Sequence, residues 1–375
     1  MTRTTRSFFG RAATAGLAAL AALAAGAAPA QTKEPIAIGV IANLTGTDVK
    51  SSTAMVRGVE LAAEAVNAAG GADGHPIKLI VEDSQYKTQE ALNAATKLFD
   101  VDKVPAVIMF GGSSLELAVA PIAKAKGKLL INTSSSSPKL GEFPGTLYSI
   151  LPLDDIVGKA LGAWVATQSV KSVAFVVPNN TFGIGLMDAS AAAFEAAGGK
   201  VLTKIVYSEG QPDYRTDLQQ LLARQPDAII TAGYGDDSRT VFKAARGLGL
   251  KQSWYAAYPS ILTVENEAWM NGRLLGVDDG GLTGATAAKV AAAYKAKHDD
   301  GEPTPHVFYG YDALMLIAKA AAMPAGLGPT SLEAAVKGYD GATGPIVWNA
   351  NGQRIDPPID IIAYKDGKFA TIGHQ

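Results

Sequence analysis

Short apolar runs alternate with segments of helical periodicity along most of this chain. Residues 36–42 form the first apolar run and are predicted to be a buried strand. Apolar residues then recur at helical spacing over 55–66, where Ser51 or Ser52 is the expected cap and Gly70-Gly71 is typical of a helix end. Repetition of this unit predicts an α/β fold, with parallel strands covered by helices on both faces.

The first half of the chain contains four such strand–helix units. Their strands are predicted at residues 36–42, 77–81, 104–110 and 128–131. The helix after the second strand is predicted to begin at Thr88, and the helix after the third strand is predicted to span 115–126. The pattern changes at 146–152, and a second set of elements follows. That set has helices at 154–168, 182–197, 213–223 and 236–248, and strands at 172–177, 201–207, 228–232 and 253–256.

The last hundred residues mix helices and strands. Helices are predicted at 288–297, 311–322 and 332–336, and strands at 346–348, 359–364 and 369–372, with Asp366-Gly367 as a hairpin turn. Because the chain contains two α/β sets in succession, we expect two halves with a cleft between them.

Two polar loops follow neighbouring strands of the first half. Residues 111–114 read Gly-Gly-Ser-Ser and open the helix at 115–126, and residues 133–138 read Thr-Ser-Ser-Ser-Ser-Pro. Glycines let the backbone approach a ligand, a helix start offers unpaired N–H groups, and serines add hydroxyls. At the carboxyl ends of neighbouring parallel strands, both loops would form one anion-binding crevice. The alternative is that both are ordinary helix caps and turns.

Residues 1–30 differ in composition from the rest. Arg3, Arg6 and Arg11 form a basic start, residues 12–28 are almost wholly apolar, and Ala28-Pro29-Ala30 has the small-x-small pattern of a signal-peptidase site. We therefore predict a signal peptide, cleaved after Ala30, and export by the general secretory route to a bacterial periplasm.

Composition excludes several classes of function. The chain has no Cys, so a cysteine lipid anchor, disulfides and metal–thiolate sites are impossible. Without residues 1–30, which carry three Arg and no acid, the formal charge falls from −2 to −5. This acidic balance argues against a nucleic-acid partner. No other long apolar run indicates a membrane span.

The usual enzyme motifs are missing. No G-x-G-x-x-G follows the first strand, and the chain has no G-x-x-x-x-G-K-[ST], H-E-x-x-H or G-x-S-x-G. The four His are dispersed, and no nucleophile lies near a base in the sequence. We predict no catalytic residues, no metal and no cofactor, although a catalytic set assembled only in space is left open.

An ordered set of segments resembles the periplasmic solute-binding proteins of ABC transporters, branched-chain amino-acid (leucine/isoleucine/valine-binding) type. The segments span the mature chain: residues 38–40, 58–71, 81–83, 111–122, 131–138, 180–183, 213–214, 232–234 and 343–345. The resemblance implies two Rossmann-like lobes of the type I, Venus-flytrap kind, joined by crossovers near 150–152, 276–281 and 343–348. Lobe 1 would comprise 31–150 and 279–345, and lobe 2 would comprise 151–278 and 346–375.

The resemblance also implies where a ligand binds. Its carboxylate would be held in lobe 1 by Ser113, Ser134 and Ser136, whose chemistry agrees with an anion site at strand ends and a helix start. Lobe 2 would supply an aromatic wall of ligand-binding residues, Phe182, Tyr234 and Tyr258, although each aromatic alone more often serves packing.

One departure from the family bears on ligand class. Amino-acid binders of this family place an acid in lobe 2 against the ligand ammonium, and Tyr258 stands at that point. Asp236 or Asp237 is the alternative partner for an ammonium, although a helix cap is expected there. Ser51 stands about where some amino-acid binders carry Tyr. The sequence thus predicts that non-amino carboxylates, aromatic acids first, bind more tightly than leucine, isoleucine or valine. His306 is a further candidate for the pocket.

The expected function is capture of a small carboxylate, an amino acid or an aromatic acid, and its delivery to a membrane ABC permease by a monomer. A sensory protein that signals to a membrane receptor is the alternative. An enzyme on the same two-lobed scaffold is disfavoured by the missing motifs.

Overall fold

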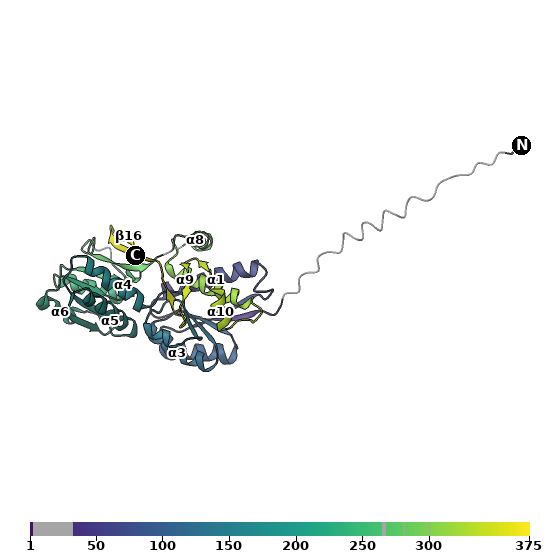
Figure 1. The fold of residues 1–375 in the computed structure, drawn as a ribbon, viewed down its shortest axis with the longest axis horizontal. Helices are drawn as coiled ribbons and strands as arrows, with labels where there is room; N and C mark the ends of the chain where they lie inside the picture. The colour runs from purple at the N-terminus through teal and green to yellow at the C-terminus, as the bar shows by residue number, and fades with distance from the viewer. Residues whose placement is uncertain (3–32, 265–267, 281, 300) are drawn as a thin grey trace.

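The computed structural model describes residues 1–2, 33–264, 268–280, 282–299 and 301–375, and Figure 1 shows two lobes side by side. The predicted signal peptide lies outside the described residues except for its first two. Among the described residues, no helix is both long and apolar enough to cross a membrane.

The first lobe is built on a five-stranded, all-parallel sheet in the order β2-β1-β3-β4-β5. Its strands are β1 (Ile36–Ala42), β2 (Ile77–Asp83), β3 (Ala106–Met109), β4 (Leu129–Asn132) and β5 (Leu147–Ser149). Its helices are α1 (Val49–Ala68), α2 (Thr88–Thr96) with the π-helical η1 (Lys97–Val101), α3 (Ser113–Ala125), the 3₁₀ helix η2 (Pro138–Glu142), α8 (Ala285–Lys297), α9 (Pro305–Ala321) and α10 (Pro329–Ala335).

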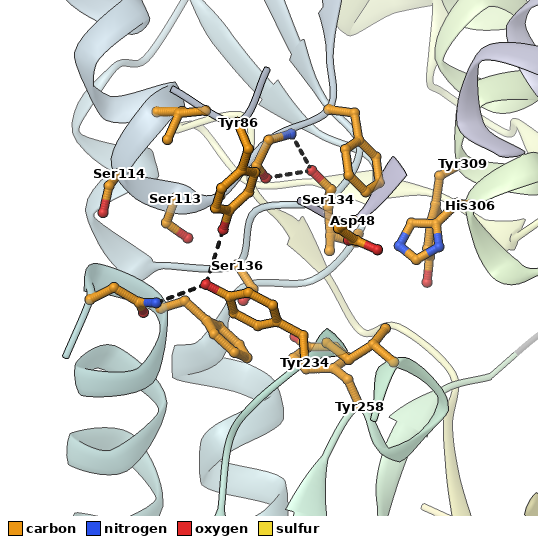
Figure 2. Close-up of a pocket in the computed structure, with 18 of the residues that line it drawn as sticks. Asp48, Tyr86, Ser113, Ser114, Ser134, Ser136, Tyr234, Tyr258, His306 and Tyr309 are labelled. Carbon is orange, nitrogen blue, oxygen red and sulfur yellow. Dashed lines mark hydrogen bonds between the residues drawn. The ribbon is translucent and has the colours of Figure 1, made fainter. Parts of the chain in front are cut away.

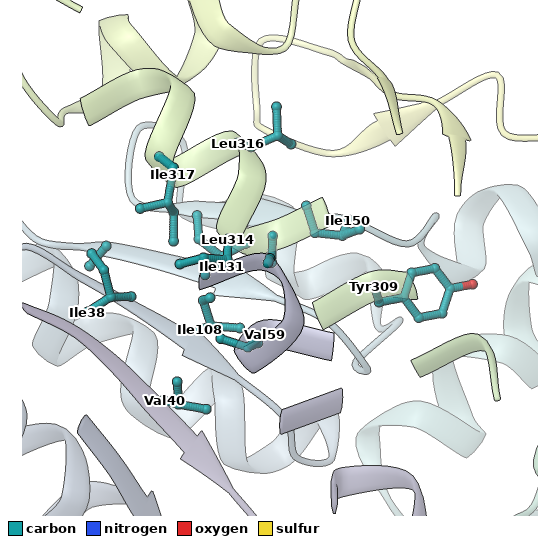
Figure 3. Packing of buried hydrophobic residues seen from close by; sticks show 14 of the residues in the cluster. Ile38, Val40, Val59, Ile108, Ile131, Ile150, Tyr309, Leu314, Leu316 and Ile317 are labelled. Atoms are coloured by element: carbon teal, nitrogen blue, oxygen red, sulfur yellow. The ribbon is translucent and has the colours of Figure 1, made fainter. Parts of the chain in front are cut away.

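Alternate residues of each strand pack on opposite faces of this sheet, because strand side chains point to the two faces in turn. Ile38, Ile108 and Ile131 face α1 and α9, where they meet Val59 and Leu314 (Figure 3). Residues of the other parity pack against α2 and α3. Both faces are therefore buried, which explains why the strands read as continuous apolar runs.

Helices α1 and α9 cross at two glycines. A Cβ on Gly58 would lie 1.9 Å from the carbonyl oxygen of Val307, and a Cβ on Gly310 would lie 2.2 Å from that of Met55. Only residues without a Cβ allow so close an approach of the two backbones. This crossing places the first turn of α9 next to the start of α1, at the edge of the sheet that carries the polar loops.

The second lobe contains a seven-stranded sheet in the order β16-β15-β10-β9-β8-β6-β7, in which β15 runs antiparallel to both of its neighbours. Its strands are β6 (Ser172–Pro178), β7 (Lys200–Tyr207), β8 (Ala228–Thr231), β9 (Ser253–Ala257), β10 (Leu274–Asp279), β15 (Ile359–Lys365) and β16 (Lys368–His374). Its helices are α4 (Asp154–Thr167), α5 (Thr181–Ala196), α6 (Arg215–Arg224), α7 (Gly235–Gly247) and the 3₁₀ helix η3 (Pro259–Ile261).

Buried Arg354 ties together the chain segments between the lobes. It belongs to β14 (Arg354–Ile355), which pairs with β13 (Val347–Trp348) after the small ladder of β11 (Asp340–Gly341) and β12 (Gly344–Pro345). Its guanidinium donates to the carbonyl oxygens of Ile150, Thr343 and Pro345 at 2.9, 2.6 and 2.8 Å. One side chain thus joins the first crossover to the third.

The type I periplasmic binding protein fold predicted from the sequence is confirmed. The exact lobe boundaries stay a prediction. Three local expectations were wrong. Strands β5 and β10 were not predicted, α9 starts at Pro305 rather than at residue 311, and neither Ser51 nor Ser52 caps α1. Instead, Ser52 accepts the backbone N–H of Asn43, and the hydroxyl of Ser51 donates to Asp48.

Candidate functional site

A cavity of about 200 Å³ lies between the two lobes and is lined from both. We call it the inner cavity. All six ligand-binding residues predicted from the sequence line it, as does His306. Its lining is Asp48, Tyr86, Phe110, Gly111, Gly112, Ser113, Ser114, Leu115, Ser134, Ser136, Leu151, Asn180, Phe182, Glu209, Tyr234, Tyr258, Ser260, Ile261, Asp278, Pro305, His306 and Tyr309. Figure 2 draws most of these residues.

The first polar loop places the start of α3 at the cavity. Gly112 is the N-cap of α3 and has no side chain that could accept a hydrogen bond from the helix start. The first hydrogen bonds of the helix run from the N–H groups of Leu115 and Glu116 to the carbonyl oxygen of Gly112. The backbone N–H groups of Ser113 and Ser114 have no acceptor among the described residues. Unpaired N–H groups at a helix start favour an anion.

The second polar loop is shaped by buried Asn132, at the end of β4. Its side-chain oxygen accepts the backbone N–H groups of Ser134 and Ser135 at 3.0 and 2.8 Å, and its amide donates to the carbonyl oxygen of Ser135. The backbone N–H of Ser136 has no acceptor in the described part of the chain. A third unpaired donor therefore lies at the cavity.

The three serine hydroxyls differ in the hydrogen bonds that they already make within the protein. Ser134 donates to the carbonyl oxygen of Gly111 at 2.8 Å and accepts the Gly111 N–H at 2.9 Å, and Ser136 donates to Asp154 at 3.0 Å. The hydroxyl of Ser113 only accepts, from the N–H of Ser137 at 3.2 Å. Since a hydroxyl has one hydrogen to donate, Ser113 is the serine whose hydrogen the closed protein leaves available.

The second lobe contributes the expected aromatic wall. The ring centroid of Phe182 lies 6.0 Å from that of Tyr234 and 6.3 Å from that of Tyr258. Tyr258 is buried and has a φ of 51°, a left-handed conformation that is rare for a bulky residue. Such backbone strain is concentrated at functional sites. The three rings form one apolar face opposite the polar loops.

The sequence did not predict a group of hydrogen-bonded side chains at the mouth of the cavity. Tyr86 donates to the phenolic oxygen of Tyr234 at 3.0 Å, and Tyr234 donates to Glu209. Asn180 caps α5 through its oxygen while its amide donates to Glu209 at 2.8 Å and to Tyr234 at 2.9 Å. Burial raises the pKa of Tyr86 to about 12, so its hydroxyl keeps its hydrogen at neutral pH.

The first turn of α9 closes the cavity on the side of the first lobe. His306 packs edge-on against Phe110, with ring centroids 5.2 Å apart, and lies 6.1 Å from the ring of Tyr309. Burial lowers the pKa of His306 to about 4, so the imidazole is neutral near pH 7. Its position in the sequence, just before the apolar segment 308–314, gave only a weak indication that it lines the cavity.

The charged residues that line the inner cavity are all acids. They are Asp48, Glu209 and Asp278, and no Lys or Arg lies in the lining among the residues that the structure describes. Asp236 and Asp237, the acids considered from the sequence, instead line a larger neighbouring space of about 930 Å³, which we call the outer chamber.

The side chains of these two acids also have other partners. Asp236 pairs with Arg239 at 2.9 Å, and Asp237 accepts from the hydroxyl of Tyr214 at 2.6 Å. Ser51 likewise lines the outer chamber and not the inner cavity. None of these three residues therefore contacts the inner cavity.

The sequence pattern of the family described as periplasmic binding protein matches residues 35–368, and the chain belongs to that family. An amino acid binding protein of Pseudomonas aeruginosa is 27% identical over 57% of this chain and 58% of its own length. Leu/Ile/Val-binding protein homolog 3 of Brucella melitensis is 24% identical over 90% of this chain and 93% of its own length. The resemblance stated from the sequence is confirmed.

Solved structures of similar proteins share the fold. A leucine binding protein from Thermotoga maritima has a TM-score of 0.82 and 23% identity, over 90% of this chain and 98% of that one. A branched-chain amino acid transporter substrate binding protein from Streptococcus pneumoniae, in complex with isoleucine, has a TM-score of 0.80 and 23% identity over 91% and 99%. A solute binding protein from Rhodopseudomonas palustris, in complex with 3,4-dihydroxybenzoic acid, has a TM-score of 0.78 and 21% identity over 91% and 96%.

Proposed function

We propose that this chain is the periplasmic substrate-binding component of an ABC importer. It captures one small carboxylate in the inner cavity, as a monomer, and delivers it to a membrane permease. The observation that carries the proposal is the set of unpaired donors at the cavity: the backbone N–H groups of Ser113, Ser114 and Ser136, and the hydroxyl of Ser113. Neutral donors on rigid strand ends and a helix start suit a carboxylate.

The opposite wall completes the site. Phe182, Tyr234 and Tyr258 present apolar faces to the side chain or ring of the ligand, while the polar loops hold its charged end. Because the two walls belong to different lobes, a ligand that contacts both favours the closed arrangement of the lobes over an open one. The permease would then recognise the closed form.

The ligands bound to similar proteins support a small carboxylate as the ligand, but they do not favour one chemical class of carboxylate. Isoleucine and 3,4-dihydroxybenzoic acid, bound to two proteins of the same fold, share a carboxylate and an apolar body. A thermal-shift screen of amino acids and aromatic acids tests the proposal, because a ligand at 100 times its dissociation constant adds about 2.7 kcal/mol to the stability of the folded protein. The protein is first freed of copurified ligand by unfolding and refolding.

The role in transport needs a separate measurement. A strain that lacks this protein should lose energy-dependent uptake of the ligand found in the screen, and the plasmid-borne gene should restore uptake. Uptake that is unchanged in the deletion strain would contradict the importer role while leaving binding intact.

A further inference from the structure

The imidazole of His306 is a polar group of the inner cavity that makes no polar contact within the protein. Among the described residues, neither of its ring nitrogens has a hydrogen-bond or ion-pair partner. His75 and His374 differ, because the Nδ1 of each lies 2.7 Å from a protein oxygen. Since polar groups inside proteins are nearly always hydrogen-bonded, the imidazole of His306 is available to a partner from outside the chain.

Neighbouring rings hold the imidazole of His306 in place without using its nitrogens. Its centroid lies 5.2 Å from that of Phe110, at an interplanar angle of 68°, and 6.1 Å from that of Tyr309, at 73°. Pro305 restricts the backbone just before it, at the first position of α9. His306 is half-buried and lines both the inner cavity and the outer chamber. The ring is therefore fixed beside space that a ligand can fill.

His306 and the donors at the start of α3 lie in different parts of the inner cavity. Figure 2 shows the ring of His306 well apart from Ser113 and Ser114, with Ser134 and Tyr234 between them in this view. Since all these residues line the same cavity, a ligand held by its carboxylate at the start of α3 can bring its other end to His306.

A neutral imidazole suits a ligand hydroxyl. Burial lowers the pKa of His306 to about 4, so near pH 7 one ring nitrogen carries a hydrogen and the other is an acceptor. A hydroxyl can donate to the second nitrogen or accept from the first. A second carboxylate is less well suited, because the ring offers it a single donor and no positive charge.

We infer that His306 is a specificity-determining residue that hydrogen-bonds a hydroxyl group at the end of the ligand remote from its carboxylate. The ligand is then a hydroxylated carboxylate. This inference rests on the proposed function, because it assigns the second end of a ligand whose carboxylate lies at the polar loops.

The test compares ligands that differ only in a hydroxyl remote from the carboxylate. The pairs are benzoate and 4-hydroxybenzoate, phenylalanine and tyrosine, and hexanoate and 6-hydroxyhexanoate, each titrated calorimetrically into refolded, ligand-free protein near pH 7. We expect the hydroxylated member of at least one pair to bind about five-fold more tightly, since a hydrogen bond between neutral groups is worth about that factor.

The variant His306→Phe keeps a flat ring against Phe110 and Tyr309 but has no hydrogen-bonding atom in its side chain. It should weaken binding of the hydroxylated member about five-fold and change binding of the other member less than about two-fold. A loss of folded protein would lower the number of sites and not this ratio. His298→Phe is the matched control, because His298 is also half-buried and packs on a tyrosine ring, 4.7 Å from Tyr294, outside the cavity lining. It should keep the parental ratio.

Equal affinities within every pair, tighter binding of the members without the hydroxyl, or a parental ratio in His306→Phe would overturn this inference and leave the proposed function standing. The same conclusion follows if the parent binds none of the six compounds while the wider screen finds another carboxylate. Failure to bind any of the six, together with no stabilised ligand in the screen, would overturn the proposed function and this inference with it.

Discussion

Tyr86 of the first lobe donates its phenolic hydrogen to the phenolic oxygen of Tyr234 of the second lobe, at 3.0 Å (Figure 2). Tyr86 follows β2 and has a φ of 55°, and Tyr234 is the N-cap of α7. Both residues line the inner cavity and the outer chamber. The pair therefore stands at the boundary between the two spaces and forms only when the lobes are together.

Removal of this bond should favour the open protein. Tyr86→Phe keeps the ring but loses the hydroxyl, and we expect ligand binding to weaken by roughly 0.5–1.5 kcal/mol. The same variant should increase the radius of gyration of the ligand-free protein in small-angle scattering. Tyr148→Phe is the control, because Tyr148 donates to Glu333 at 2.9 Å within the first lobe. Equal affinities for Tyr86→Phe and the parent would contradict a closing role for this bond.

His306 should make the protein less stable in acid. Burial lowers its pKa to about 4 in the folded state, whereas the unfolded chain has an ordinary value of 6.5. Since the unfolded state binds the proton more readily, this contribution is present above pH 6.5 and is lost as the pH falls through 4. His306→Gln should flatten the dependence of the free energy of unfolding on pH between about 6.5 and 4, measured by urea denaturation. Parallel profiles for the variant and the parent would show that His306 is not the responsible group.

Glu116 should act in the opposite direction. It is fully buried in α3, and burial raises its pKa well above the ordinary value of 4.5. The folded carboxyl thus holds its proton where the unfolded one has lost it, so stability falls as the pH rises above 4.5. Glu116→Gln should be more stable than the parent at pH 7 and show a flatter decline in this range. A variant that is less stable than the parent at every pH would argue against this reading.

Arg354 should contribute much more to stability than an exposed arginine. Arg354→Leu leaves three carbonyl oxygens of the crossovers without their guanidinium donor, two of them buried, and we expect a loss of about 3 kcal/mol or more in the free energy of unfolding. Arg215→Leu is the control, because Arg215 forms an exposed ion pair with Asp213 and should cost less than about 1 kcal/mol. Similar losses for the two variants would exclude a special role at the crossovers.

The sequence predicted those helices and strands in which apolar residues follow a clear local pattern. Strand β1 was placed to the residue and helix α7 to within one residue, because apolar runs and helical periodicity are local signals. Strand β10 was missed because Leu274–Asp279 contains a glycine and two acids and so lacks an apolar run. It is a strand because it pairs with β9 on one side and β15 on the other.

The residues of the candidate site were likewise predicted only in part. The two serine loops were found because each follows a strand and has a distinctive composition. Tyr86, Glu209 and Asp278 gave no such signal, since they come together only when the strand ends of two sheets meet. Asp278 in particular depends on β10, so a missed strand also hid an acid of the cavity.

The central claim is that the donors of the polar loops hold the carboxylate of a ligand. Calorimetric titration of refolded, ligand-free protein with leucine and with benzoate, in the parent and in Ser113→Ala, tests it most directly. Ser190→Ala is the matched control, because Ser190 is a buried serine that donates to the carbonyl oxygen of Gly158 at 2.9 Å, outside the cavity lining.

We predict one-to-one binding of at least one of these carboxylates to the parent, a loss of roughly 1–3 kcal/mol in Ser113→Ala, and parental affinity in Ser190→Ala. Parental affinity in Ser113→Ala, or no binding of either carboxylate by the parent, would contradict the claim.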